Sequence, residues 1–156
     1  MVRILVTDDH ALLRSGLRLL LDREDDLEVV GEATTAEDAI ERTTDGDVDL
    51  VLLDIEMPGM GGLAGAKRLR ADHPDLGILV LSMHGEADDV RRAFAAGASG
   101  YVLKTAADEQ LVVSVRTVES HRAHVMTKLR AGSRAAMVRH AIAAGMLDDE
   151  RAAPGA

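Results

Sequence analysis

The chain has no cysteine, and Phe94 and Tyr101 are its only aromatic residues among 156. Without thiols it can form neither a disulfide nor a thiolate zinc site, which fits a reducing compartment. No apolar run approaches the ~20 residues that a membrane span needs, and the N-terminus has no signal-peptide pattern. These absences predict a soluble, cytoplasmic protein without a membrane partner.

The charge is unevenly distributed along the chain. Residues 1–104 contain 21 acidic and 11 basic residues, whereas residues 111–147 contain six basic residues and a single acid, Glu119. A basic tail on an acidic body indicates a surface for nucleic acid or for an acidic partner on the tail alone. A solvated helix face that complements the acidic body explains the same charges, so charge does not decide between the two.

Short apolar runs alternate with segments of helical periodicity. Strands are predicted at residues 2–7, 28–31, 48–53, 78–81 and 100–103, with helices at about 11–22, 35–44, 63–72 and 86–96. Thr35 is the expected N-cap of the second helix. A strict strand–helix alternation with short connections predicts an α/β fold with a doubly wound parallel sheet.

Polar side chains follow four of these predicted strands. Asp8 and Asp9 follow the first, Asp54 the third, Ser82 the fourth and Lys104 the fifth. Because the carboxyl ends of parallel strands lie side by side, the four segments can build one pocket. Three carboxylates this close repel one another, and a hard divalent cation is the usual remedy. With a lysine and a hydroxyl added, the pocket suits a phosphoryl group arriving on a carboxylate.

This ordered set resembles the receiver domain of bacterial two-component response regulators. It comprises Asp8, Asp9, Asp54, Ser82, Tyr101 and Lys104, with Met57-Pro58-Gly59 just past Asp54. The resemblance covers residues 1–112 and implies a flavodoxin-like five-stranded sheet of strand order 2-1-3-4-5. It also implies a phosphoacceptor signalling protein rather than an enzyme, with a sensor histidine kinase as its partner.

By resemblance, Asp54 accepts the phosphoryl group and Lys104 pairs with the phosphoryl oxygens. The implied cofactor is Mg²⁺, bound by Asp9, Asp54 and the carbonyl of Glu56 with help from Asp8. Two plainer interpretations also fit the sequence, in which Asp9 caps the helix near residue 11 and Lys104 is an ordinary surface lysine.

Ser82 and Tyr101 resemble the switch pair of the family. There the hydroxyl moves toward the phosphoryl group and the ring turns inward, which makes a two-state element biased by a new charge. A tyrosine that merely fills an edge strand is the alternative. His84, near the pocket, is expected to be a loop residue rather than a metal ligand, because the other candidate ligands are all oxygens.

A different pattern begins after Lys104. One helical stripe contains Leu111, Val115, Val118, Val125, Met126 and Leu129, which predicts a single helix over residues 107–130. A break at Val112-Val113-Ser114 is the alternative, because β-branched residues disfavour helix and Ser114 could cap a new one. A last helix is expected to end near residue 144, and residues 148–156 to fray.

Residues 113–147 resemble the end of a LuxR-type (NarL/FixJ-like) helix-turn-helix domain, namely its recognition helix and last helix. In that family most of the fifth receiver helix, a linker and two further helices lie between Leu111 and Ser114, and here they are missing. The missing helices include the one that holds the recognition helix in the DNA groove. By family position, the possible DNA-facing residues are Arg116, Thr117, Glu119, Ser120, Ala123 and Lys128.

Several outputs stay open. Val115 and Val118 share their phase with Leu111 and can join the receiver core, and the rest of the stripe can form a homodimer through residues 118–147. A phosphorylation-controlled DNA-binding transcriptional regulator is the alternative. An aspartate-nucleophile phosphatase is a third possibility, because Glu56 lies two residues after Asp54. Such enzymes, however, are expected to have their nucleophile after the first strand.

Overall fold

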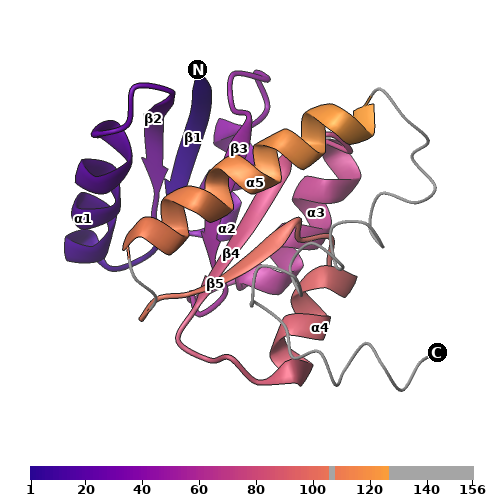
Figure 1. The fold of residues 1–156 in the computed structure, drawn as a ribbon. Coiled ribbons are helices and arrows are strands. Elements are labelled where there is room, and N and C mark those ends of the chain that lie inside the picture. The colour runs from indigo at the N-terminus through magenta and orange to yellow at the C-terminus, as the bar shows by residue number, and fades with distance from the viewer. Residues whose placement is uncertain (106–107, 127–156) are drawn as a thin grey trace.

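The computed structural model describes residues 1–105 and 108–126, with side chains as far as His121. Within these residues, five strands alternate with five helices (Figure 1). The strands are β1 Val2–Thr7, β2 Leu27–Ala33, β3 Leu50–Asp54, β4 Gly77–Ser82 and β5 Gly100–Leu103. The helices are α1 Ala11–Asp22, α2 Ala36–Arg42, α3 Gly62–Asp72, α4 Ala87–Ala95 and α5 Asp108–Met126. No helix in this described part is long and apolar enough to cross a membrane.

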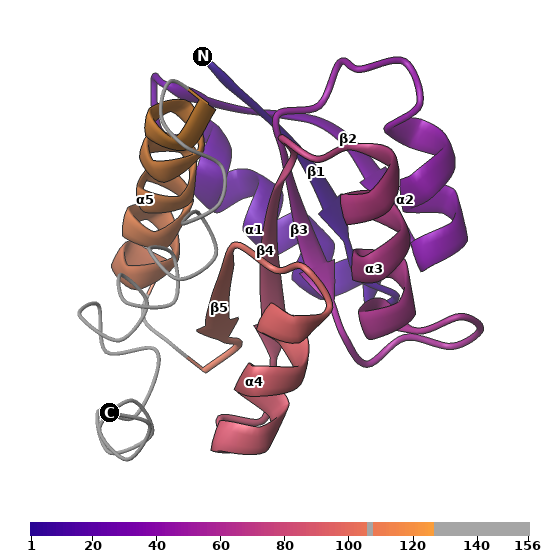
Figure 2. The ribbon, with the colours of Figure 1, turned by 90° about the vertical axis from the view of Figure 1, so that its right-hand side faces the viewer.

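The strands form one parallel sheet in the order β2-β1-β3-β4-β5, which confirms the predicted fold. Helices α1 and α5 lie on one face of the sheet, and α2, α3 and α4 lie on the other (Figure 2). Because successive side chains of a strand point to opposite faces, fully buried strands supply both layers. The sequences of these strands are therefore continuous apolar segments and do not alternate between apolar and polar residues.

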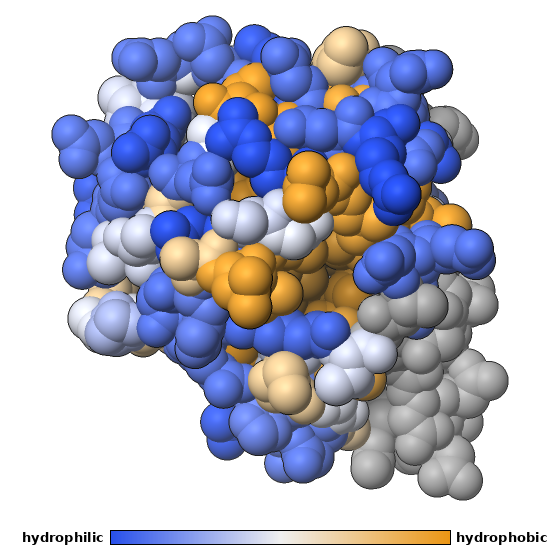
Figure 3. Space-filling model, turned by 90° about the vertical axis from the view of Figure 1, so that its left-hand side faces the viewer, coloured by the Kyte–Doolittle hydropathy of each residue, from blue (hydrophilic) through white to orange (hydrophobic). Residues whose placement is uncertain are grey.

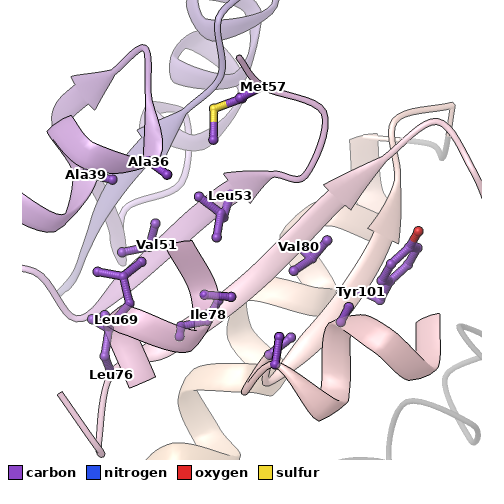
Figure 4. Packing of buried hydrophobic residues seen from close by; sticks show 14 of the residues in the cluster. Ala36, Ala39, Val51, Leu53, Met57, Leu69, Leu76, Ile78, Val80 and Tyr101 are labelled. Atoms are coloured by element: carbon purple, nitrogen blue, oxygen red, sulfur yellow. The ribbon is translucent and has the colours of Figure 1, made fainter. Parts of the chain in front are cut away.

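Each face of the sheet has its own apolar cluster. The cluster under α2, α3 and α4 packs strand residues such as Val51, Ile78 and Val80 against small helix residues including Ala36 and Ala39 (Figure 4). The cluster under α1 and α5 packs the alternate strand positions against leucines and valines of those helices. Thr35 caps α2 as predicted, since its hydroxyl accepts a hydrogen bond from the amide of Asp38 at 3.1 Å.

The observed boundaries differ from the predicted ones by a few residues. Strand β2 is longer than expected and β3 starts two residues later, at Leu50. Leu50 is the first residue of β3 to pair in register with β1, opposite Ile4.

Helix α5 runs without interruption from Asp108 to Met126. The prediction of one continuous helix is confirmed over this range, and the alternative break at 112–114 is not seen. Val115 and Val118 are buried in the same cluster as Leu111, which confirms their predicted place in the core. The expected limits of this helix at 107 and 130, the last helix and the C-terminal tail lie outside the described residues.

Candidate phosphoacceptor site

The carboxyl ends of the strands bring the predicted residues together at one edge of the sheet. Asp54 and Ser82 are the last residues of β3 and β4, while Asp8 and Lys104 follow β1 and β5 directly. The Asp8 and Asp54 residues are completely buried. The guanidinium of Arg14 donates to the backbone carbonyl of Asp8 at 2.8 Å and fixes the chain there.

Lys104 links the two buried carboxylates. Its Nζ lies 3.1 Å from Oδ2 of Asp8 and 3.1 Å from Oδ2 of Asp54, and only 8% of its side chain is exposed. Among the described residues, neither oxygen has an aligned hydrogen-bond donor, so the contacts with Lys104 are ion pairs. Two buried carboxylate oxygens that share one cation still have unused capacity to bind positive charge. The interpretation of Lys104 as an ordinary surface lysine does not fit this geometry.

The charges of the pocket are strongly coupled. Burial raises the pKa of Asp54, and the charge of Asp8 adds to this, while the backbone amide of Glu56 and the ammonium of Lys104 oppose it. For Lys104, burial alone would lower the pKa, but the attraction of Asp54 and Asp8 outweighs it and the pKa is raised. The lysine is therefore a permanent cation beside a carboxylate that is costly to keep charged.

Tight turns shape the loop that follows Asp54. The amide of Glu56 donates to Oδ1 of Asp54 at 2.9 Å, which leaves Oδ2 as the oxygen on the Lys104 side. The loop returns so closely that a Cβ on Gly62 would lie 2.3 Å from the Cα of Ile55. Only glycine fits at position 62, because any side chain there would collide with the backbone after β3.

A fourth potential ligand, His10, joins the acid cluster. One ligand atom from each of Asp8, Asp9, His10 and Asp54 lies within 4.8 Å of the others. Nδ1 of His10 is 3.1 Å from Oδ1 of Asp8 and 3.1 Å from Oδ1 of Asp9. His10 is not among the site residues predicted from the sequence, although a histidine directly after an acid pair at a strand end is a usable signal.

His10 is also the N-cap residue of α1, and its side chain makes no capping hydrogen bond. The alternative role of Asp9 as the cap is therefore not supported. The side chain of Asp9 is 31% exposed, so it faces the open side of the pocket. Asp8, by contrast, lies at its base and accepts a hydrogen bond from the His10 amide at 2.8 Å.

Ser82 and Tyr101 both bind His84. The amide of His84 donates to Oγ of Ser82 at 3.0 Å, and the hydroxyl of Tyr101 donates to the carbonyl of His84. The ring of Tyr101 is buried at the end of the α2–α3–α4 cluster (Figure 4), and burial raises its pKa. The ring thus points inward. His84 Nε2 lies 3.3 Å from Oε1 of Glu56, away from the acid cluster.

The candidate DNA-facing residues from Arg116 to Ala123 lie on α5, and the structure assigns one of them a different contact. The guanidinium of Arg116 pairs with Asp26 and Glu24, in the turn between α1 and β2, at 2.7 to 3.0 Å. Thr117 and Glu119 are partly exposed and Ser120 is exposed. The side chains of Ala123 and Lys128 lie outside the described ones.

Comparisons with known proteins identify the family. A family model described as "Response regulator receiver domain" matches residues 4–116. A second one, "Bacterial regulatory proteins, luxR family", matches residues 97–141, so residues 97–116 match both. In the fold these shared residues include β5 and the first half of α5.

Named relatives agree with both matches. The chain is 36% identical over 129 residues to the response regulator UvrY of Escherichia coli (strain K12), a match that covers 83% of this chain and 59% of the relative. A solved LuxR-family two-component response regulator from Aurantimonas sp. SI85-9A1 is 33% identical, with a TM-score of 0.74, and the match covers 77% of this chain and 86% of that one.

The receiver domain of NarL from Mycobacterium tuberculosis is 34% identical with a TM-score of 0.72, over 76% of this chain and 96% of that one. The match to UvrY spans less than two thirds of that relative's length. This chain therefore belongs to the receiver-domain response regulators of bacterial two-component systems, and its C-terminal part is similar to the LuxR family of regulatory proteins.

Proposed function

We propose that Asp54 accepts a phosphoryl group from the phosphohistidine of a sensor histidine kinase. The observation that supports this most is the pairing of Lys104 with the buried Oδ2 atoms of Asp8 and Asp54. Oδ1 of Asp54 is held by the Glu56 amide, and Oδ2 is the attacking oxygen. The bond from Oδ2 to phosphorus forms as the phosphorus–nitrogen bond to the donor histidine breaks, and the imidazole leaves.

Lys104 has a defined role in this reaction. A carboxylate is a weak nucleophile, so positioning and charge neutralisation must lower the barrier. The Lys104 ammonium lies beside Oδ2 of Asp54 before the reaction. It can follow the charge onto the phosphoryl oxygens, because the acyl phosphate is more negative than the carboxylate. The side chain is a compact cation on a flexible stem, which suits such a movement.

The acid cluster suits Mg²⁺. Two buried carboxylate oxygens without an aligned donor, and a more exposed acid at the mouth, match the oxygen ligands that this ion prefers. Asp9, Asp54 and the carbonyl of Glu56 would bind it, with Asp8 helping. When bound, the ion would neutralise charge on the carboxylates and on the phosphoryl oxygens.

The switch pair would act through the segment around His84. Ser82 would exchange the His84 amide for a phosphoryl oxygen, to which its hydroxyl can donate. Because Tyr101 is already buried and bound to the His84 carbonyl, we expect the backbone at 83–85 to move more than the ring. This changes the surface around α4 and β5, which is how a partner would read the phosphorylated state.

Beryllofluoride, a mimic of the phosphoryl group, tests the acceptor. Asp54→Asn should abolish beryllofluoride binding in the presence of Mg²⁺, measured by ¹⁹F NMR, because the anchoring carboxylate is gone. Asp45→Asn is the matched control, since Asp45 is exposed and lies after α2. Undiminished binding by the Asp54 variant would exclude the proposal, and steady hydrolysis of a generic phosphomonoester by the wild type would favour the phosphatase alternative.

The homodimer proposed through residues 118–147 needs one correction. Val118 is buried within its own receiver, so it is not available to a second copy. The proposed interface therefore begins beyond Val118.

Sedimentation of the chain with and without beryllofluoride tests for a dimer. Binding of one duplex with nanomolar affinity would instead support the alternative of an intact DNA-binding regulator.

A further inference from the structure

We propose that residues 114–121, which resemble part of a LuxR-type recognition helix, are permanently used as the C-terminal helix of the receiver and do not read DNA in this chain. The helix that contacts DNA in a helix-turn-helix unit is held by a neighbouring helix that crosses the backbone. Here the receiver sheet holds residues 114–121 instead. It follows that phosphorylation acts without this helix entering a DNA groove. This consequence rests on the proposed function, because it requires that the chain is phosphorylated.

The apolar face of the segment is part of the receiver core. Val115 is completely buried and Val118 is 3% exposed, and both belong to the cluster that contains the strand residue Leu79. They are spaced by three residues, which places them on one face of α5. A helix that used this face to pack on scaffold helices of its own domain would have to leave the sheet.

The sheet is shaped to receive Val118. A Cβ built on Gly77 of β4 would lie 3.2 Å from Cγ1 of Val118, and one on Gly100 of β5 would lie 3.0 Å from Cγ2. Both distances are shorter than ordinary carbon–carbon contacts. Two adjacent strands thus lack a side chain at the point where Val118 packs, which allows the helix to approach the sheet closely.

A polar contact fixes the same segment from the other side. Nε of Arg116 lies 3.0 Å from Oδ2 of Asp26, and Nη2 lies 2.9 Å from Oδ1 of Asp26 and 2.7 Å from Glu24. This is a bidentate pair of the kind that arginine forms with phosphate. The carboxylates raise the pKa of Arg116. The arginine that could have contacted a DNA phosphate is already paired with carboxylates of its own domain.

The surroundings of the helix are unfavourable for DNA. The hollow between α1 and α5 is lined by Leu20, Arg23, Glu24, Asp108, Glu109, Val112, Val113 and Arg116. Figure 3, which views the molecule from the side of α1, shows apolar surface among polar side chains. Three acids against two arginines, one of them paired, do not form the basic surface that binds phosphates.

Hydrogen exchange and DNA selection together test the proposal. The hydrogen-exchange rates of the amides of residues 115–119 should lie within about tenfold of the rates of residues 79–81 in β4. Neither a pool of random-sequence DNA duplexes nor beryllofluoride should increase the rates of residues 115–119. Repeated selection from the same pool should enrich no sequence. Faster exchange of 115–119 on adding the duplexes would overturn the proposal.

An enriched DNA sequence would also overturn the proposal if its binding is lost in Ser120→Ala but kept in Val113→Ala. Val113 is the matched control, because it lies on the same helix and is 56% exposed. The beryllofluoride arm separates the two proposals. If Asp54 is not the acceptor, beryllofluoride fails to bind, yet residues 115–119 stay protected in every condition.

Discussion

Replacing Val118 with alanine tests whether the second half of α5 belongs to the receiver core. The valine is buried between Gly77 and Gly100, with γ carbons facing both strands. The variant removes these two carbons and leaves a gap that the glycines cannot fill. Val113→Ala is the matched control, because Val113 has the same side chain on the same helix but is 56% exposed.

The magnitude follows from the two carbons. Their transfer from the core to water costs about 0.8 kcal/mol each, and the cavity left behind adds to this cost. The free energy of unfolding should therefore fall by roughly 2 kcal/mol more in Val118→Ala than in Val113→Ala. A difference of that size between a buried and an exposed site is typical. The higher helix propensity of alanine, ~0.5 kcal/mol, affects both variants alike and cancels in the comparison.

Urea unfolding followed by circular dichroism measures this difference. The midpoint of Val118→Ala should drop with an unchanged slope, which is the signature of altered stability rather than altered compactness. If the two variants unfold at the same urea concentration, Val118 is not part of the folded core. The account of α5 as a receiver helix would then be wrong.

Because burial raises the pKa of Asp54, the charge of this carboxylate destabilises the metal-free fold. Asp54→Asn should therefore be more stable than wild type near pH 7 in EDTA. Its advantage should shrink as the pH falls and the wild-type carboxyl takes up its proton, which urea unfolding at a series of pH values measures. His10→Ala should weaken binding of Ni²⁺ more than of Mn²⁺ or Mg²⁺ in calorimetric titrations, because imidazole suits Ni²⁺ whereas oxygen ligands suit the other two ions. Equal losses for all three ions would exclude His10 as a ligand. Arg116→Ala should lower the thermal midpoint at low salt, and the loss should nearly vanish at about 1 M salt; a loss independent of salt would show that its ion pairs with Glu24 and Asp26 are not responsible.

The pocket could be predicted because its signals are local. Apolar runs that end in Asp8, Asp54 and Lys104 place these residues at strand ends, and a parallel sheet then brings the ends together. The continuity of α5 was also predictable, since Leu111, Val115 and Val118 share one helical phase. These conclusions depend on periodicity, which the sequence displays directly.

Other contacts depend on how distant side chains meet. Arg116 pairs with Asp26 and Glu24, about ninety residues earlier in the chain, and no sequence period connects them. The rotamer of His10, which brings its ring to the acids, depends on the turn between β1 and α1. The hydrogen bond from Tyr101 to the His84 carbonyl likewise requires the loop after β4 to be in place.

Phosphorylation by acetyl phosphate shows directly whether Asp54 is the acceptor. The chain is incubated with acetyl phosphate and Mg²⁺, its intact mass is recorded, and the modified peptide is mapped. We predict the gain of one phosphoryl group on the peptide that contains Asp54, with no gain in Asp54→Asn or in EDTA and a normal gain in Asp45→Asn. A phosphoryl group that persists in Asp54→Asn, or that maps to another peptide, would contradict the assignment of Asp54 as the acceptor.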